Sequence, residues 1–555
     1  MTGTVKRVPS IWTTGSTEIL NTGTWRSAIA VHEKRPAPCF GACPVDGEIP
    51  VWVQQVRSEK FREAWQTLVE NNPIPAAIGR TCHRPCEGAC NRIEYDGAVS
   101  INALEQYVGD MAIREGWAFD APEVELEPKV AVVGGGPAGL SCAYQLRRKG
   151  FQVSLFDANP ELGGVLRYGV PEYRLPKQMV AAETRRIVDL GIEVITGRKL
   201  TGADLGELEK DFSAIFIAFG AHDAKRLPQF PKNDSRVLDG IAFLRSIRLD
   251  APLKLGRRVV VIGGGSVAMD VAGSALRLGQ QVQILALEGR AVMPAPEDEI
   301  EDVIEEGALL NDGAMVKTIE DVSGAFLLHC IKVELDPDAP AGVIRPIEIA
   351  GTEFTLEADT VILAVGQDPE LADWDDRIQV AKGMIDVDAE YRTSRPGIFA
   401  AGDVASAERF VATAIGDGKR AANSIAHYLG QPIVAEQGAA DGAKEVNFED
   451  INTFYFPPQL PGERDKVAVE VRKAGFAEIR LGLEDEQALA QAKRCFSCGS
   501  CVECDNCAIF CPDMAIQKDP TALLHYKVLE QYCKGCGCCL EECPRGAMGV
   551  KEETK

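Results

Sequence analysis

The chain has 555 residues, 46% of them hydrophobic and 25% charged, so it has enough apolar material for several globular domains. A formal net charge of −23 argues against a nucleic-acid-binding protein. The sequence has no run of about 18 apolar residues and no apolar signal core near its start, so we expect no membrane span and a cytoplasmic location.

Residues 1–35 are predicted to form an irregular leader, and residues 36–120 a helical domain that binds iron–sulfur clusters. The helical domain carries five cysteines: Cys39, Cys43, Cys82, Cys86 and Cys90. Five cysteines are one more than a single [4Fe-4S] cube needs and three fewer than two cubes need. Between them, residues 51–73 have an apolar spacing that predicts helix, with its aromatic residues in the core.

A first dinucleotide-binding unit follows a short linker at residues 121–128. A β-branched strand leads into Gly134-x-Gly136-x-x-Gly139 and then into a helical pattern. The glycines permit a tight turn, a close approach of backbone N–H groups to a pyrophosphate, and close helix–strand packing. The next predicted strand ends at Asp157, where a carboxylate can accept hydrogen bonds from ribose hydroxyls.

The same arrangement recurs at Gly263-x-Gly265-x-x-Ala268, and the following strand ends at Glu288. Two such units in one chain predict two different dinucleotides. Further along, the acidic block at residues 297–306 (EDEIEDVIEE) is expected to be a solvated helix face. Cys142 and Cys330 are isolated in apolar surroundings and are expected to be buried, so we find no redox-active disulfide pair.

The C-terminal region carries C-x2-C-x2-C-x3-C-P twice, which is the spacing of a bacterial two-cluster ferredoxin. In this motif three close cysteines bind one cube and the fourth binds the other. The expected ligand sets are Cys501, Cys504, Cys507 and Cys543 for one cube, and Cys533, Cys536, Cys539 and Cys511 for the other. Cys538 is left over and is not expected to be a ligand.

Four segments together carry a family resemblance: GGGPAGL, LGGVLRYGVPEYRLP, GGGSVAMD and FAAGDV. They resemble the glutamate synthase small-subunit family, which includes the flavin half of dihydropyrimidine dehydrogenase and the large subunit of the electron-bifurcating transhydrogenase. The resemblance covers roughly residues 36–430 and implies that the first unit binds FAD, with a nicotinamide-binding unit inserted into it. We therefore expect an α/β multidomain fold with an α-helical Fe-S domain, two nested Rossmann-type domains and a C-terminal ferredoxin-like α+β domain.

The expected boundaries are 129–240 and 385–430 for the FAD domain, 241–384 for the NAD(P) domain, 431–480 for a connector and 481–555 for the ferredoxin domain. The resemblance implies FAD contacts at Gly134, Gly135, Gly136, Pro137, Ala138, Gly139, Asp157, Gly164, Val165, Arg174, Leu200, Gly402, Asp403, Ala414 and Ile415. It implies nicotinamide dinucleotide contacts at Gly263, Gly264, Gly265, Ser266, Val267, Asp270, Glu288, Arg290 and Gly366.

The chain departs from its NADP-using relatives after the second strand of the inserted unit. Those relatives place a basic pair there, whereas this chain has Leu287 and Glu288. A carboxylate repels a 2′-phosphate and suits a free 2′-hydroxyl, so NADH is favoured over NADPH. Arg290 lies two residues on and leaves NADP(H) open, as does an orientation of Glu288 toward solvent.

By the resemblance, the N-terminal domain holds two cubes with interleaved ligands. The cube nearer the flavin would take Cys43, Cys82, Cys86 and Glu105, with Gln106 as the competing choice for the last ligand. The other cube would take Cys39, Cys90 and a C-x2-C pair that relatives carry upstream and this chain lacks. The segment ending in Cys495 and Cys498 resembles the missing one, displaced to the other end of the chain. We hypothesise that Cys39, Cys90, Cys495 and Cys498 share a cube, the alternative being four unliganded thiols.

A nicotinamide carries two electrons as hydride, iron–sulfur cubes carry one each, and FAD exchanges both kinds. The sequence therefore predicts an NAD(P)H:ferredoxin-type oxidoreductase with FAD and three to four [4Fe-4S] clusters. By analogy it would be an electron-transfer subunit of a hetero-oligomeric complex, with a ferredoxin or a redox enzyme such as a 2-oxoacid:ferredoxin oxidoreductase as partner. The alternatives are a glutamate synthase small subunit, a bifurcating transhydrogenase subunit, and a non-catalytic scaffold that carries clusters.

Overall fold

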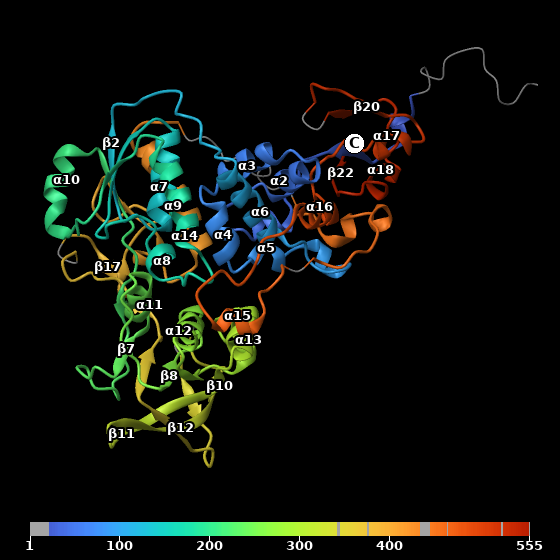
Figure 1. Cartoon of the computed structure of the whole chain (residues 1–555). Coiled ribbons are helices and arrows are strands. Elements are labelled where there is room, and N and C mark those ends of the chain that lie inside the picture. The colour runs from blue at the N-terminus through green and yellow to red at the C-terminus, as the bar shows by residue number, and fades with distance from the viewer. Residues whose placement is uncertain are drawn as a thin grey trace, which may run out of the picture.

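The computed structural model describes residues 21–340, 344–374, 377–432, 444–462, 464–522 and 525–553. Figure 1 shows two α/β units joined at one side to a helical domain, with the C-terminal module beyond it. The expected fold class is confirmed, because each α/β unit is built on a parallel Rossmann-like sheet. Among the described helices, none combines the length and the apolar character that a bilayer crossing requires.

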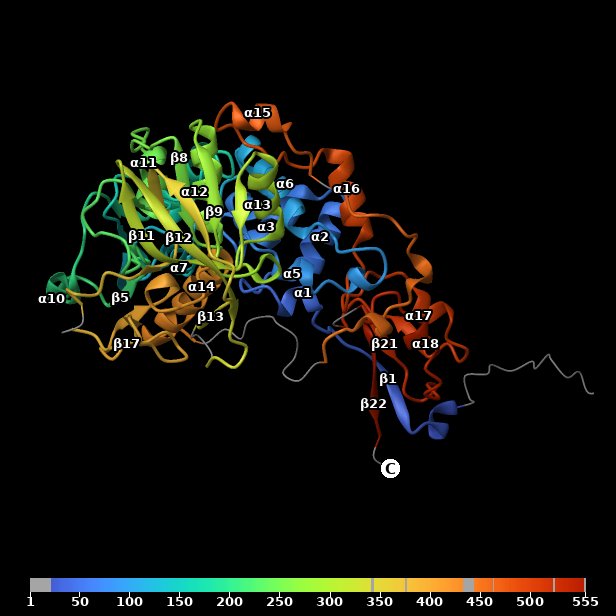
Figure 2. The ribbon, with the colours of Figure 1, turned by 90° about the horizontal axis from the view of Figure 1, so that it is seen from below.

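The N-terminal segment forms a strand where the sequence predicts an irregular leader. Strand β1 (Ala28–His32) pairs antiparallel with β22 (Met548–Glu552) near the C-terminus, with Ala28 opposite Glu552 and His32 opposite Met548. Figure 2 shows the two strands side by side. The Arg26 guanidinium adds a hydrogen bond of 3.2 Å to the carbonyl of Cys533. The leader therefore belongs to the C-terminal module, and the prediction for residues 1–20 lies outside the described residues.

The helical domain contains α1 (Pro38–Gly41), α2 (Ile49–Arg57), α3 (Phe61–Val69), α4 (Pro75–Thr81), α5 (Pro85–Gly88) and α6 (Ile101–Arg114). The predicted helix at 51–73 is thus split into α2 and α3, and its aromatic residues Trp52 and Trp65 are buried as expected. Helices α4 and α6 cross closely, since a Cβ on Gly109 would lie 2.4 Å from the backbone nitrogen of Ala76. Helix α16 (Asp485–Arg494), from the far end of the chain, packs on α2 and α6.

The first sheet has the order β19-β5-β2-β3-β4, with all neighbours parallel. Its strands are β2 (Lys129–Val133), β3 (Gln152–Phe156), β4 (Glu193–Ile195), β5 (Ala214–Ile217) and β19 (Ile398–Ala400). Its principal helices are α7 (Pro137–Arg148), α9 (Lys177–Val188) and α14 (Val411–Tyr428). Because β19 follows the second sheet in the chain, the second unit is inserted into the first.

The second sheet has the parallel order β10-β9-β8-β15-β7. Its strands are β7 (Val237–Asp239), β8 (Arg258–Ile262), β9 (Gln281–Leu285), β10 (Leu309–Asn311) and β15 (Thr360–Leu363), with helices α11 (Gly240–Arg248), α12 (Ser266–Arg277) and α13 (Glu297–Glu305). An antiparallel sheet of β11 (Ala314–Val322), β12 (Ala325–Leu335), β13 (Pro346–Glu348) and β14 (Phe354–Ala358) extends from it. Cys142 in α7 and Cys330 in β12 are buried in separate cores, as expected.

The remaining α-helices and β-strands of the described residues are short. They are α8 (Val165–Tyr168), α10 (Leu205–Asp211), β6 (Asp223–Ala224), β16 (Gln367–Asp368), β17 (Val380–Ala381), β18 (Met384–Ile385) and, in the C-terminal module, α17 (Asn506–Ile509), β20 (Ile516–Lys518), β21 (Tyr526–Val528) and α18 (Cys538–Glu541).

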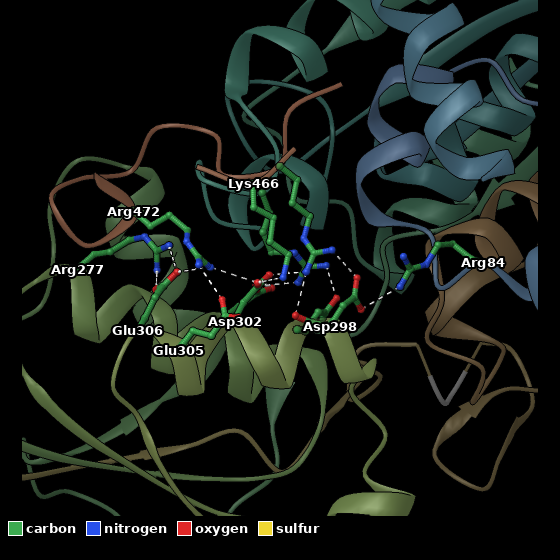
Figure 3. A network of polar contacts seen from close by, with 12 residues as sticks. Arg84, Arg277, Asp298, Asp302, Glu305, Glu306, Lys466 and Arg472 are labelled. Carbon is green, nitrogen blue, oxygen red and sulfur yellow. Dashed lines mark hydrogen bonds and ion pairs between the residues drawn. The ribbon is translucent and has the colours of Figure 1, made fainter. Parts of the chain in front are cut away.

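The connector around α15 (Val469–Lys473) covers part of the acidic helix α13, which the sequence predicts to be solvated. Asp302 of α13 is buried and accepts from Lys466 at 2.9 Å, and it pairs with Arg472 at 3.3 Å. Arg84 of the helical domain reaches Asp298, with 2.9 Å between the charged atoms (Figure 3). The prediction of a solvated surface is therefore wrong for this face of the helix. Its carboxylates form ion pairs with cations from distant segments instead of being solvated by water. Glu301 of the same helix is exposed, as expected.

Candidate functional site: a dinucleotide cavity next to a chain of cysteine sites

Both glycine-rich turns line one cavity of about 1510 Å³ between the two α/β units. Pockets for a single small ligand usually measure about 300–1,000 Å³, so the space suits two ligands. Gly136 and Gly265 are open toward this space, since a Cβ at Gly136 would meet only one atom, at 3.9 Å, and one at Gly265 none within 4 Å. The turns therefore offer bare backbone to a pyrophosphate in two places, at the N-termini of α7 and α12.

On the first unit, most of the residues expected to contact FAD line the cavity: Gly134, Gly136, Pro137, Ala138, Asp157, Gly164, Val165, Arg174, Leu200, Gly402, Asp403 and Ala414. The other three are buried in the supporting structure. Gly135 donates its N–H to Asp157 Oδ2 at 2.8 Å, and a Cβ on Gly139 would lie 1.8 Å from the Gly134 carbonyl oxygen. The carbonyl of Ile415 accepts from Ser141 at 2.7 Å. Burial raises the pKa of the Asp403 carboxyl, while Arg409 opposes that rise.

On the second unit, the cavity is lined by Gly263, Gly264, Gly265, Ser266, Val267, Asp270, Glu288 and Gly366. Glu288 is half-buried, and its Oε2 lies 2.6 Å from where a Cβ on Gly264 would be. The carboxylate therefore rests against the glycine turn, where the ribose of a bound dinucleotide is expected. Arg290 is exposed and pairs with Glu297, away from this position.

Arg174, expected as an FAD contact, has a further role that the sequence did not reveal. Its guanidinium donates to Asp270 at 2.8 Å and to Glu299 at 2.5 Å, so it links the FAD-side wall to two helices of the inserted unit. Burial raises the pKa of the Asp270 carboxyl to about 7, and the positive charge of Arg174 opposes that rise. No single motif contains this triad, because each residue comes from a different helix or loop.

The cavity reaches the first cysteine site of the helical domain. Thr81 and His83 line the cavity, and Cys82 lies between them. The His83 ring stacks on Phe410, directly before α14, with 3.9 Å between ring centroids. The flavin-side wall and the first expected cube site therefore share a short stretch of backbone.

At this first site, burial together with the charges of Glu105 and Cys43 raises the pKa of Cys82 to about 12. Burial likewise raises the pKa of Cys86, with Cys43 and Cys82 as its charged neighbours. The Glu105 carboxylate accepts from Asn72 at 2.7 Å, and burial raises its pKa to about 7. The three thiols and this carboxylate are thus mutual neighbours, which fits the expected ligand set. Metal binding would exchange their protons for a cationic core.

Gln106, the competing ligand, is engaged elsewhere. Its Oε1 accepts from Arg464 Nη1 at 2.7 Å, and Arg464 also donates to the carbonyl of Gly79 at 2.9 Å. The amide oxygen is therefore occupied by the connector, whereas the carboxylate of Glu105 is next to the thiols. This arrangement favours Glu105.

The four cysteines of the hypothetical shared cube line one small cavity between α1, α2 and the end of α16. These are Cys39, Cys90, Cys495 and Cys498, together with apolar residues including Val53, Val99 and Phe496. Burial raises the pKa of Cys39, and the charges of Cys495, Cys498 and Cys90 raise it further. The Asn91 amide also approaches Cys498 Sγ at 3.6 Å. Two parts of the chain that are about 400 residues apart thus supply one set of four partly buried thiols around a single cavity.

The C-terminal cysteines gather as the doubled motif predicts. Burial raises the pKa of Cys507 to about 12, and Cys543, Cys501 and Cys504 are its charged neighbours. The second set surrounds a cavity lined by Cys511, Cys533, Cys536, Cys538 and Cys539. Cys538 is exposed, as are the expected ligands Cys504 and Cys536, so exposure does not separate it from the ligands and its exclusion stays a prediction of the motif. Among the described residues no three His, Cys, Asp or Glu side chains converge as ligands of a single ion. A cube, in contrast, distributes its ligands over four iron atoms.

The pyridine nucleotide-disulphide oxidoreductase profile matches residues 128–418, which is more than half of the chain. The chain belongs to this family. A second profile, dihydropyrimidine dehydrogenase domain II with a 4Fe-4S cluster, matches residues 31–117. The cysteines within the matched residues are Cys142 and Cys330, which are buried in separate cores.

Three curated relatives are informative. The chain is 33% identical to the NADP(+)-dependent formate dehydrogenase subunit beta of Moorella thermoacetica, over 83% of this chain and 70% of that one. It is 32% identical to the glutamate synthase [NADPH] small chain of Escherichia coli, over 70% and 88%. It is 33% identical to the NAD-dependent dihydropyrimidine dehydrogenase subunit PreT of Salmonella typhimurium, over 71% and 91%. The resemblance to the glutamate synthase small-subunit family is confirmed, and the relatives are named as subunits that use NADP(H) or NAD.

Proposed function

We propose that this chain is the electron-transfer subunit of a larger oxidoreductase, and that it passes electrons between NAD(H) and a partner redox enzyme through FAD and four [4Fe-4S] clusters. When bound, FAD exchanges hydride with a nicotinamide and single electrons with iron–sulfur clusters. The observation that carries the proposal is the short stretch of backbone from Thr81 to His83: both of these residues line the dinucleotide cavity, and Cys82 between them belongs to the first cysteine site.

From that wall the cysteine sites follow one another toward the C-terminal module. Cys39 of the second site has Cys86 of the first among its charged neighbours. Arg545 donates to the carbonyl of Cys495 at 3.2 Å and lies two residues after Cys543 of the third site. Cys507 of the third site has Cys539 of the fourth among its neighbours. This order supports a single path with the ferredoxin-like module at its outer end.

The protein's own residues supply binding and orientation. The two glycine turns would receive the pyrophosphates, and Asp157 and Glu288, which lie just after β3 and three residues after β9, would receive the ribose hydroxyls. Because Glu288 rests against Gly264, its charge would oppose a 2′-phosphate, so we propose NADH as the preferred nucleotide.

Anaerobic stopped-flow reduction tests the proposal, with NADH or NADPH as donor and ferredoxin or a viologen as acceptor. We expect NADH to bleach the flavin and then to reduce the acceptor. If neither nucleotide bleaches the flavin, the proposed function is wrong. Iron analysis tests the cluster count separately: four cubes require about 16 Fe per FAD, three require about 12, and the C-terminal pair alone requires about 8.

The existence of a partner subunit is supported by the relatives, which are named as subunits. We propose that the partner receives electrons at the C-terminal module. Co-purification of the tagged chain from its native source, followed by mass spectrometry, tests this: a stoichiometric redox subunit is expected, and a chain that purifies alone and fully active with ferredoxin would contradict it.

A further inference from the structure

Strand β1 of the leader forms part of the wall around both cube sites of the C-terminal module. Side chains alternate along a strand, so Ala28, Ala30 and His32 share one face. Ala28 and Ala30 line the cavity that holds Cys511, Cys533, Cys536 and Cys539. His32, at the other end of that face, places its Nε2 at 3.5 Å from Cys507 Sγ, in the neighbouring site.

We propose that His32 donates a hydrogen bond from Nε2–H to the Cys507 sulfur and thereby tunes the reduction potential of the cube held by Cys501, Cys504, Cys507 and Cys543. The inference rests on the proposed function, in that it requires this cube to be present. It assigns a role in electron transfer to a residue that lies far outside the ferredoxin motif.

The direction of the hydrogen bond follows from the chemistry of the two groups. A cysteine sulfur bound to iron carries no proton, so it can only accept. The ring nitrogen must then carry the hydrogen, which fixes the tautomer with an unprotonated Nδ1. The structure agrees with this tautomer, because Nδ1 of His32 is buried with no hydrogen-bond partner among the described residues. An unprotonated Nδ1 leaves only a lone pair unsatisfied there, whereas a protonated one would leave a buried donor.

The ring is held in position by its surroundings. It stacks on Tyr526 of β21, with 5.2 Å between centroids and 20° between planes. Tyr526 in turn donates to Asp505 at 2.7 Å, next to the cube ligands Cys504 and Cys507. The strand itself is fixed by its pairing with β22 and by Arg26. His32 is therefore a positioned donor rather than a mobile surface group.

A donor to a cube sulfur stabilises the more negative, reduced state, because the extra charge spreads onto the sulfurs. Removing it should make one-electron reduction of this cube about tenfold less favourable, which corresponds to a potential about 59 mV lower. The other cubes should keep their potentials. A merely structural histidine would not produce this selective effect.

The test uses the full-length holoprotein as wild type, His32→Phe, His32→Gln and Tyr526→Phe. His32→Phe keeps an aromatic ring for the stack and removes the donor, while His32→Gln removes the ring and keeps an N–H. Tyr526→Phe keeps both the stack and the donor and loses only the bond to Asp505. Midpoint potentials are measured by EPR-monitored redox titration, and iron content is measured in each sample.

We expect one cube to shift to lower potential in His32→Phe, most of the shift to be absent in His32→Gln, and Tyr526→Phe to match wild type. Equal shifts in His32→Phe and His32→Gln, or no shift in either, would overturn the inference. If His32→Phe fails to retain iron, electron–nuclear double resonance on the reduced wild type decides. In wild type we expect an exchangeable proton that is magnetically coupled to the cube. In His32→Gln this signal should be lost or its coupling changed. If wild type lacks the signal, the inference is overturned. Wild-type protein with no cubes at all would instead mean that the proposed function is wrong.

Discussion

Glu288 provides the sharpest test of nucleotide preference, through the variant Glu288→Gln. The side chain lies three residues beyond β9, which ends at Leu285 and not, as the sequence predicts, at Glu288; its Oε2 is 2.6 Å from where a Cβ on Gly264 would be. Glutamine keeps the size and one acceptor oxygen but removes the charge. The change therefore separates electrostatic repulsion of a 2′-phosphate from the shape of the pocket.

The expected size of the effect follows from the half-buried position of Glu288. Two unit charges 4 Å apart interact by about 1 kcal/mol in water and about 4 kcal/mol at an effective dielectric constant of 20. For the repulsion between Glu288 and a 2′-phosphate we take an intermediate value of about 2 kcal/mol. This energy corresponds to a preference of about thirty-fold in kcat/KM for NADH over NADPH. In Glu288→Gln most of this preference should disappear. The reaction with NADH should also weaken, by up to about tenfold, because a neutral amide binds ribose hydroxyls less strongly than a carboxylate does.

The assay is anaerobic stopped-flow bleaching of the flavin over a range of NADH and NADPH concentrations. Glu301→Gln is the matched control, since Glu301 is an exposed acid on α13 outside the cavity wall. It should leave the ratio of the two rates unchanged. A wild type that reacts faster with NADPH, or a Glu288→Gln variant with an unchanged ratio, would refute the electrostatic argument.

Three further changes address other parts of the molecule. Cys495→Ala combined with Cys498→Ala should remove about 4 of about 16 Fe per chain, and full iron retention would exclude the shared cube. Arg472→Met should weaken the contact between α13 and α15 by about 3 kcal/mol, seen as faster hydrogen exchange in α15, because it leaves buried carboxylates less well neutralised. Exchange rates equal to wild type would contradict this. Gly418→Ala should destabilise the flavin domain and lower its FAD content, because a Cβ would lie 2.3 Å from a carbonyl oxygen of α7, whereas Gly206→Ala, with nothing within 4 Å, should not. Equal FAD content in both variants would refute the packing argument.

Much of the nucleotide site could be predicted from sequence because its chemistry is local. The turn at Gly134 needs a positive φ, here 111°, and a helix N-terminus directly after it. Both requirements fall on consecutive residues, so they produce a local sequence motif. The doubled ferredoxin motif is local in the same way, because the spacing of its cysteines is the spacing with which a short segment of chain binds a cube. The gathering of Cys39 and Cys495 could be hypothesised only through a family resemblance, since no local pattern connects them.

The features that sequence did not reveal depend on partners far along the chain. Residues 28–32 lack the polar–apolar alternation of a half-exposed strand, and their pairing partner lies near the other terminus. Helix α13 has the composition of a solvated helix, yet Asp302 is buried because Lys466 and Arg472 come from a connector more than 160 residues away. Charge complementarity between distant segments leaves no periodic signal in either one. The position of His32 beside Cys507 is hidden for the same reason.

The four-thiol cavity places a constraint on how the protein is synthesised. Cys90 leaves the ribosome 405 residues before Cys495, which at about 5–20 residues per second is a delay of about 20 to 80 s. During that interval the nascent chain holds Cys39 and Cys90 without their partners, exposed to oxygen and to stray metals. Strand β1 can form its sheet only later still, because its pairing partner β22 is among the last segments to be translated. The second cube site and the outer end of the proposed electron path are therefore completed only after translation is almost finished, so premature termination would leave a flavoprotein that accepts hydride but has no outlet for its electrons.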